Sequence, residues 1–96
     1  MTAQDALANH RLARAGEALA EADLLMSAKR WSGALNRLYY ALFYAARALL
    51  ALKRIDSSRH SGVIALFQEH YVKPGFVSAD VARALPQAFA RRQRAD

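Results

Sequence analysis

Five side chains able to take part in binding or catalysis lie within one apolar stretch, residues 34–52. They comprise two arginines, two tyrosines and one amide: Asn36, Arg37, Tyr40, Tyr44 and Arg47. In a helix, the seven-residue spacing of Arg37 and Tyr44 is close to two turns, so both side chains lie on nearly the same face, about 10 Å apart along the axis. A guanidinium and a phenol placed in this way can hold one phosphate-sized group between them.

These polar side chains allow two interpretations. Arginine, asparagine and tyrosine can all donate hydrogen bonds to the phosphates of RNA or of a nucleotide. They can equally form hydrogen bonds across an interface between two subunits, because the stretch that carries them is apolar over most of its girth. The residues alone leave both interpretations open.

The charge and composition of the chain narrow the choice of partners. The 96 residues contain 14 Lys and Arg against 8 Asp and Glu, a net charge of +6, and eleven of the basic residues are arginine. Such an excess attracts nucleic acid, nucleotides or acidic proteins, although a solvated basic surface has the same composition. There is no cysteine, and no pair of histidines has metal-ligand spacing, so we expect neither a metal site nor a cofactor.

Helices must position these residues, because alternating apolar patterns and β-branched runs are scarce. The sequence predicts an all-α protein with four helical segments: Asp5–Lys29, Ala34–Lys53, Arg59–Val72, and a segment after Ser78 that Pro86 kinks or divides. We expect one domain over residues 1–96. No apolar run reaches the roughly 20 residues needed to cross a bilayer, and the first residues lack the order of a signal peptide. A cytoplasmic protein without membrane contact is therefore expected.

The first two segments are predicted to form an antiparallel hairpin. Ser32 is the expected N-cap of the second helix, and Trp31 is expected to lie under the turn as an aromatic plug. The inner face of the first helix is expected to consist of residues at helical spacing: Leu7, Leu12, Ala15, Leu19, Ala22 and Met26.

Three stretches of the chain carry a family resemblance. They read N-R-L-Y-Y-A-L-F-Y-A-A-R-A-L-L, then S-R-H-S-G-V-I-A-L-F, and near the end R-R-Q-R-A-D. From about Ala18 onward the sequence resembles the HEPN family, and most closely the small prokaryotic branch that carries R-x-Y-Y-A-x-F-x-A. The resemblance implies an antiparallel four- to five-helix up-and-down bundle that forms a homodimer through its central helices. It also implies a further C-terminal helix that this sequence does not contain.

The resemblance also implies an activity. Many HEPN proteins are metal-independent ribonucleases, often toxins paired with a minimal nucleotidyltransferase as antitoxin. Their active site uses an arginine followed four to six residues on by a histidine, and the two subunits bring these residues together. The arginine holds the phosphate charge, and the histidine, which titrates near neutrality, moves the proton. Arg37 matches the family arginine, whereas Tyr44 stands where the histidine is expected.

This departure makes His60 important. A tyrosine hydroxyl, with an ordinary pKa of about 10, is a poor base at pH 7, but it can donate a hydrogen bond to a phosphate. His60 matches a histidine that close relatives carry in S-x-H-S-G, and a position at the positive end of a helix favours its neutral form. It is therefore the candidate base.

Two hypotheses follow from the resemblance. The first is a ribonuclease-type toxin whose catalytic residues are Arg37, Tyr44 and His60. In this hypothesis RNA or a nucleotide is bound by three further residues: Asn36, Tyr40 and Arg47. The second is a non-catalytic module that binds a nucleotide or the nucleotidyltransferase partner, with the same residues as recognition groups. Both place the Arg37 and Tyr44 face at or near the two-fold axis of a homodimer.

Overall fold

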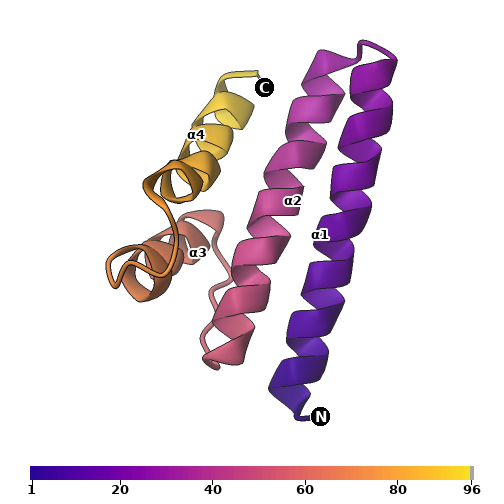
Figure 1. Ribbon diagram of the computed structural model, residues 1–96. Helices are drawn as coiled ribbons and strands as arrows, with labels where there is room; N and C mark the ends of the chain where they lie inside the picture. Colours follow the sequence, from indigo (N-terminus) through magenta and orange to yellow (C-terminus); the bar gives the residue numbers. More distant parts are fainter. Residues whose placement is uncertain (96) are drawn as a thin grey trace.

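The computed structural model describes residues 1–95, and all regular elements in this range are helices (Figure 1). They are α1 (Ala3–Ser27), α2 (Trp31–Leu52), α3 (His60–Phe67), the π-helical segment η1 (Gln68–Val72) and α4 (Ala79–Ala95). The prediction of an all-α helical bundle is confirmed. Within the described range, no helix is both long and apolar enough to cross a membrane.

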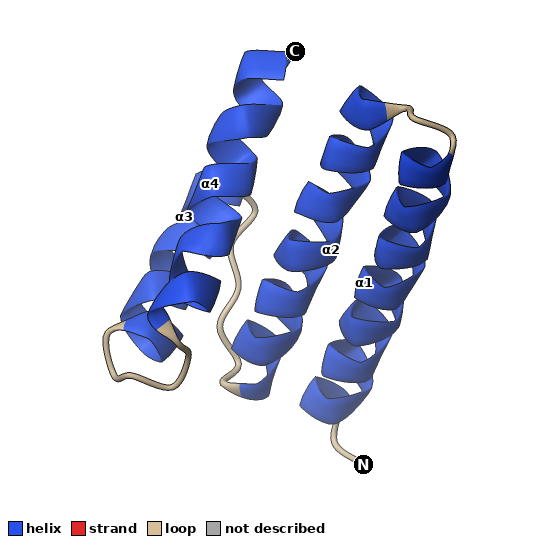
Figure 2. Cartoon of the chain, turned by 45° about the horizontal axis from the view of Figure 1, so that its top comes forward, coloured by secondary structure: helices blue, strands red, loops and turns tan. Residues whose placement is uncertain are grey.

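The central element is α2. In both views α1 lies antiparallel along one side of α2, and α3 and α4 lie on the opposite side (Figures 1 and 2). The C-terminal end of α4 lies at the same end of the molecule as the turn between α1 and α2. Because α2 is covered from two sides, it must be apolar over most of its girth, as its sequence indicates.

The two sides of α2 are packed differently. Against α1 the buried positions of both helices are almost all alanine, and we call this contact the alanine seam: Ala8, Ala15, Ala18, Ala22, Ala34, Ala41 and Ala48. Such small side chains allow two helices to approach closely. The other side holds the core of large side chains, which includes Tyr39, Phe43, Leu50, Val63, Phe67 and Leu85.

The predicted inner face of α1 is right for its alanines and wrong for its larger residues. Ala15 and Ala22 are buried, whereas Leu12, Leu19 and Met26 are 59%, 49% and 51% exposed, and Leu7 is 42% exposed. The alanine seam explains the difference. Close approach of the two helices uses the narrow alanine stripe of α1 and leaves the leucines beside it on the flanks.

The turn between α1 and α2 also differs from the prediction. Ser32 is not the N-cap, because α2 begins at Trp31, after Arg30 and without a side-chain capping bond. Trp31 is 61% exposed and is not a plug. The backbone closes the turn instead: Lys29 is left-handed (φ 58°), and the N–H groups of Lys29 and Arg30 donate to the carbonyls of Met26 and Leu25. This is a Schellman motif, which needs no aromatic support.

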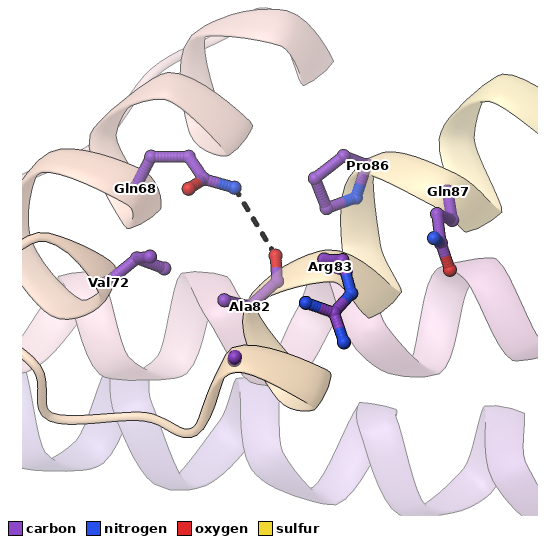
Figure 3. A pocket seen from close by; sticks show the side chains of 7 residues that line it. Gln68, Val72, Ala82, Arg83, Pro86 and Gln87 are labelled. Carbon is purple, nitrogen blue, oxygen red and sulfur yellow. Dashed lines mark hydrogen bonds between the residues drawn. The ribbon is translucent and has the colours of Figure 1, made fainter.

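The sequence predicts a kink at Pro86 or a division into two short helices. The division is wrong, because α4 continues through Pro86 as one helix. Proline has no N–H, and the carbonyl of Ala82 therefore loses its partner within the helix. The side-chain amide of Gln68, in η1, donates to this carbonyl at 3.4 Å (Figure 3). At the start of α4, the predicted cap is present, because the Val81 N–H donates to Ser78 Oγ at 3.3 Å.

Candidate functional site

One flank of α2, between its α1 side and its core side, carries two tyrosines. The ring centroids of Tyr40 and Tyr44 lie 5.9 Å apart, and both side chains are half-buried. The four-residue spacing, one turn of helix, brings the two rings together. They form a continuous aromatic strip along the exposed flank.

Arginines from three helices lie on this strip. The Cζ of Arg37, in α2, lies 5.0 Å from the Tyr40 centroid, and the Cζ of Arg92, in α4, lies 5.3 Å from the same centroid. From α1, Arg14 lies 5.3 Å from the Tyr44 centroid and donates to its hydroxyl at 3.4 Å. A guanidinium at these distances from a ring is attracted by its π-electrons. We call these five residues the cation–aromatic surface.

Two of these arginines have carboxylate partners on α1. Arg14 lies 3.4 Å from Glu17, and Arg37 lies 3.6 Å from Glu21. Arg37 also donates to the side-chain oxygen of Asn36 at 3.0 Å, which orients its guanidinium. Both glutamates are more than half exposed, and exposed ion pairs of this kind contribute only about 0–1 kcal/mol. An incoming phosphate can therefore displace the glutamates at small cost.

His60 is the first residue of α3 and lies beside the cation–aromatic surface. Its Nδ1 shares a hydrogen bond with the Tyr39 hydroxyl at 2.8 Å, and its ring lies 4.3 Å from Phe43 and 6.0 Å from Tyr40. Burial lowers the pKa of His60, and the positive charges of Arg92 and Arg47 lower it further. The imidazole is therefore neutral at pH 7, with burial as the largest cause.

Tyr39 is a neighbour of His60 that the sequence analysis did not single out. It is fully buried, and burial raises its pKa to about 12, with Arg92 opposing this shift and Tyr40 adding to it. Tyr39 therefore stays protonated and holds one nitrogen of His60. No sequence signal distinguishes it from a core tyrosine.

Arg47 belongs to a different cluster. Its Nη2 lies 3.0 Å from both carboxylate oxygens of Asp56, and the Nη2 of Arg11 lies 2.9 Å from the same carboxylate. Arg11, 8% exposed, also donates to the Arg47 carbonyl. Burial acts to raise the pKa of Asp56, but hydrogen bonds from Arg11, the Ser57 N–H and Arg47 outweigh it, and the pKa is lowered. This cluster ties α1 and α2 to the loop before α3.

The structure thus brings together part of the predicted site. Arg37, Tyr40 and Tyr44 form one surface, Asn36 orients Arg37, and His60 reaches the edge of Tyr40. Arg47 is held by Asp56. The sequence analysis did not include Arg14 and Arg92, because they come from other helices and only the tertiary arrangement places them beside the tyrosines. Among residues 1–95, no group of three or more His, Asp or Glu side chains could hold a metal ion.

Comparison with known proteins gives the family. The family model described as HEPN domain matches residues 8–96. The chain belongs to the HEPN family. No solved structure matches this HEPN chain.

Curated HEPN relatives are longer than this chain. It is 42% identical over 83 residues to a "UPF0332 protein" of Thermotoga maritima, covering 86% of this chain and 63% of the relative. It is 44% identical over 69 residues to a "UPF0332 protein" of Pyrococcus horikoshii, covering 72% and 49%. A "Putative toxin" of Methanocaldococcus jannaschii is 34% identical over 82 residues, covering 85% and 61%. The chain therefore spans about half to three fifths of the length of these relatives.

Proposed function

We propose that this HEPN chain is the toxin-like component of a two-protein system and acts by binding RNA on the cation–aromatic surface. Membership of the HEPN family and the resemblance of the chain to proteins named as toxins support the biological role. The surface itself supports RNA as the ligand.

The observation that carries this proposal is the convergence of three guanidinium groups on two adjacent tyrosine rings. Arg14, Arg37 and Arg92 can bind backbone phosphates, while Tyr40 and Tyr44 can stack on bases. Proteins that bind single-stranded RNA combine a basic surface with aromatic stacking in this way. The net charge of +6 adds long-range attraction for a polyanion.

A more specific version of this proposal is that the protein also cleaves the RNA that it binds. Arg37 would hold the phosphate, His60 would act as the base, and Tyr44 would orient the substrate. Two observations favour the alternative of binding without efficient cleavage: Tyr44 replaces the family histidine, and one nitrogen of His60 is held by Tyr39. Metal-independent cleavage needs a proton acceptor and a proton donor, and only one imidazole lies at this surface among the described residues.

We also propose the two binding partners that the family resemblance implies. They are a second copy of the chain, with Arg37 and Tyr44 near the two-fold axis, and a minimal nucleotidyltransferase. Light scattering measures the first, and co-purification with a nucleotidyltransferase encoded beside this chain tests the second. A monomer at micromolar concentration would contradict the homodimer.

Fluorescence anisotropy with a labelled single-stranded RNA tests the proposed binding. We expect Arg37→Ala to weaken binding about tenfold, because it removes a guanidinium that lies on the aromatic strip. Arg83→Ala is the matched control. It removes the same charge from an exposed arginine whose partner is Asp80, in the N-terminal part of α4. Equal effects of the two substitutions, or no RNA binding by the wild-type protein, would contradict the proposal.

A further inference from the structure

We propose that Arg92 and His60 form a phosphate subsite at the α4 edge of the cation–aromatic surface, which takes one phosphodiester group of the bound RNA. The identity of the ligand rests on the proposed function. The subsite itself is argued from the contacts of Arg92, and neither the sequence motif nor the family comparison assigns a role to this residue.

The guanidinium of Arg92 is held in a fixed position. Its Cζ lies 5.2 Å from the Tyr39 centroid and 5.3 Å from the Tyr40 centroid, and its Nη2 donates to the Tyr40 hydroxyl at 3.3 Å. Two rings and one hydrogen bond therefore orient the planar group before any ligand arrives. A group ordered in advance loses less entropy when it binds an anion.

The charge of Arg92 is not balanced within the described part of the chain. Arg14, Arg37 and Arg47 each lie within 4.0 Å of a carboxylate, and no such pair involves Arg92 among residues 1–95. The Nε of Arg92 is also buried without a hydrogen-bond partner. Native proteins carry few buried polar groups of this kind, and each one calls for an explanation. An anion beside the guanidinium would supply the missing opposite charge.

His60 completes the subsite. Its neighbours from the packed elements are Tyr39, Tyr40 and Phe43 of α2, and the charged groups that act on it are Arg92 of α4 and Arg47 of α2. Arg47 is paired with Asp56, whereas Arg92 has no carboxylate partner among residues 1–95. Arg92 and His60 both lie against the rings of Tyr39 and Tyr40, His60 at 5.8 Å and 6.0 Å between centroids. A phosphate on Arg92 would therefore lie next to His60 and raise its pKa.

A purely structural role for Arg92 is the competing explanation. Its stacking on Tyr39 and Tyr40 joins α4 to α2, so a substitution can lower the melting temperature without touching any ligand. Arg92→Gln removes the charge and keeps a hydrogen-bond donor, whereas Arg92→Lys keeps the charge and loses the planar fork. Arg91→Gln is the control, because Arg91 is the exposed neighbour on the same helix and the charge change is identical.

The direct test follows the imidazole signal of His60 by NMR while inorganic phosphate is added at constant ionic strength. In the wild-type protein and in Arg91→Gln we expect a saturable shift and a raised pKa of His60. In Arg92→Gln we expect at least tenfold weaker phosphate binding, and in Arg92→Lys an intermediate loss. A His60 signal that phosphate does not move in the wild type, or that moves equally in Arg92→Gln, would overturn the subsite.

RNA binding separates failure of the subsite from failure of the proposed function. The slope of log K against log salt reports the number of phosphate contacts. Arg92→Gln should lose about one more phosphate contact than Arg91→Gln and should therefore have the shallower slope. If RNA binds and the two variants behave alike, the subsite is wrong and the RNA-binding surface stands. If RNA does not bind but phosphate still shifts the His60 signal, the proposed function is wrong and the subsite stands. Should both Arg92 variants fail to fold, the wild-type phosphate titration decides.

Discussion

Tyr44 stands where the family resemblance places a histidine, and its neighbours are those that such a histidine would have. The Arg14 guanidinium lies over its ring, Tyr40 lies one turn before it, and Arg37 lies two turns before it on the same flank of α2. A histidine there would be a second imidazole on the cation–aromatic surface, in addition to His60. The surface would then hold both a proton acceptor and a proton donor.

We therefore predict that Tyr44→His produces metal-independent RNA cleavage above the wild-type rate. Two imidazoles near neutrality can share the two proton transfers, which a single one cannot. The measurement is degradation of labelled RNA in the presence of EDTA. Tyr44→Phe is the control and should show no gain in cleavage over the wild type, and Arg37→Ala in the Tyr44→His background should abolish the gain. Intact RNA in a Tyr44→His protein that still binds RNA would contradict this prediction.

At the residue scale, the sequence predicts contacts that one helix determines and misses those that several helices make. Arg37, Tyr40 and Tyr44 share a flank because their spacings of three and four residues fix it. Arg92 lies more than fifty positions from Tyr40 in the sequence, and no periodicity connects them. The hydrogen bond between Tyr39 and His60 also joins two different helices, so the sequence pattern does not predict it.

At the scale of elements, the number and approximate bounds of the helices follow from the sequence, but the buried face of α1 does not. Alanine and leucine are both apolar, and a helical pattern does not tell which of two neighbouring stripes will be buried. The alanine seam is chosen because the facing positions of α2 are also alanine, Ala34, Ala41 and Ala48. The match involves both helices, so the pattern of α1 alone does not reveal it. The close packing of α1 and α2 in turn brings Arg14 of α1 near Tyr44 of α2.

The hydrogen bond from Gln68 to the Ala82 carbonyl gives a prediction at this scale. We expect Gln68→Ala to reduce the free energy of unfolding by about 1 kcal/mol, because the carbonyl that Pro86 leaves without an N–H would lose its remaining partner. In a Pro86→Ala background the helix supplies that N–H, so Gln68→Ala should cost less there. Urea unfolding of the four proteins in this double-mutant cycle measures the difference. Equal costs in both backgrounds would show that the amide does not replace the missing donor.

For the whole molecule, three groups predict how stability depends on pH. The pKa of Asp56 is lowered, so its contribution is present above its ordinary pKa and is lost as the pH falls through the lower value. The pKa of His60 is also lowered, so the unfolded chain takes up this proton first and stability declines below about pH 6.5. The pKa of Tyr39 is raised to about 12, so the unfolded chain releases that proton first and stability declines above pH 10.

We therefore predict a plateau of the free energy of unfolding between about pH 7 and pH 10, with a decline on both sides. Urea unfolding at pH 5, 7, 9, 11 and 12 measures it. The alkaline decline from Tyr39 should be on the order of 2 kcal/mol by pH 12, and Tyr71, whose pKa burial also raises, acts in the same direction. Tyr39→Phe is the control for the alkaline side. Its profile should fall less steeply above pH 10, and an unchanged fall would contradict the assignment.

Because α4 is one continuous helix, a change of its direction at Pro86 would move Arg92 near its C-terminal end. Arg92 lies six residues beyond Pro86, which is about 9 Å along the axis, so a rotation of about 10° at the proline would displace the guanidinium by roughly 1.5 Å. That displacement is enough to break its bond to the Tyr40 hydroxyl. Gln68 donates a hydrogen bond to the Ala82 carbonyl, which lies on the N-terminal side of Pro86. We therefore expect the hydrogen bond from Gln68 to restrain the position of the Arg92 guanidinium as well as the stability of α4.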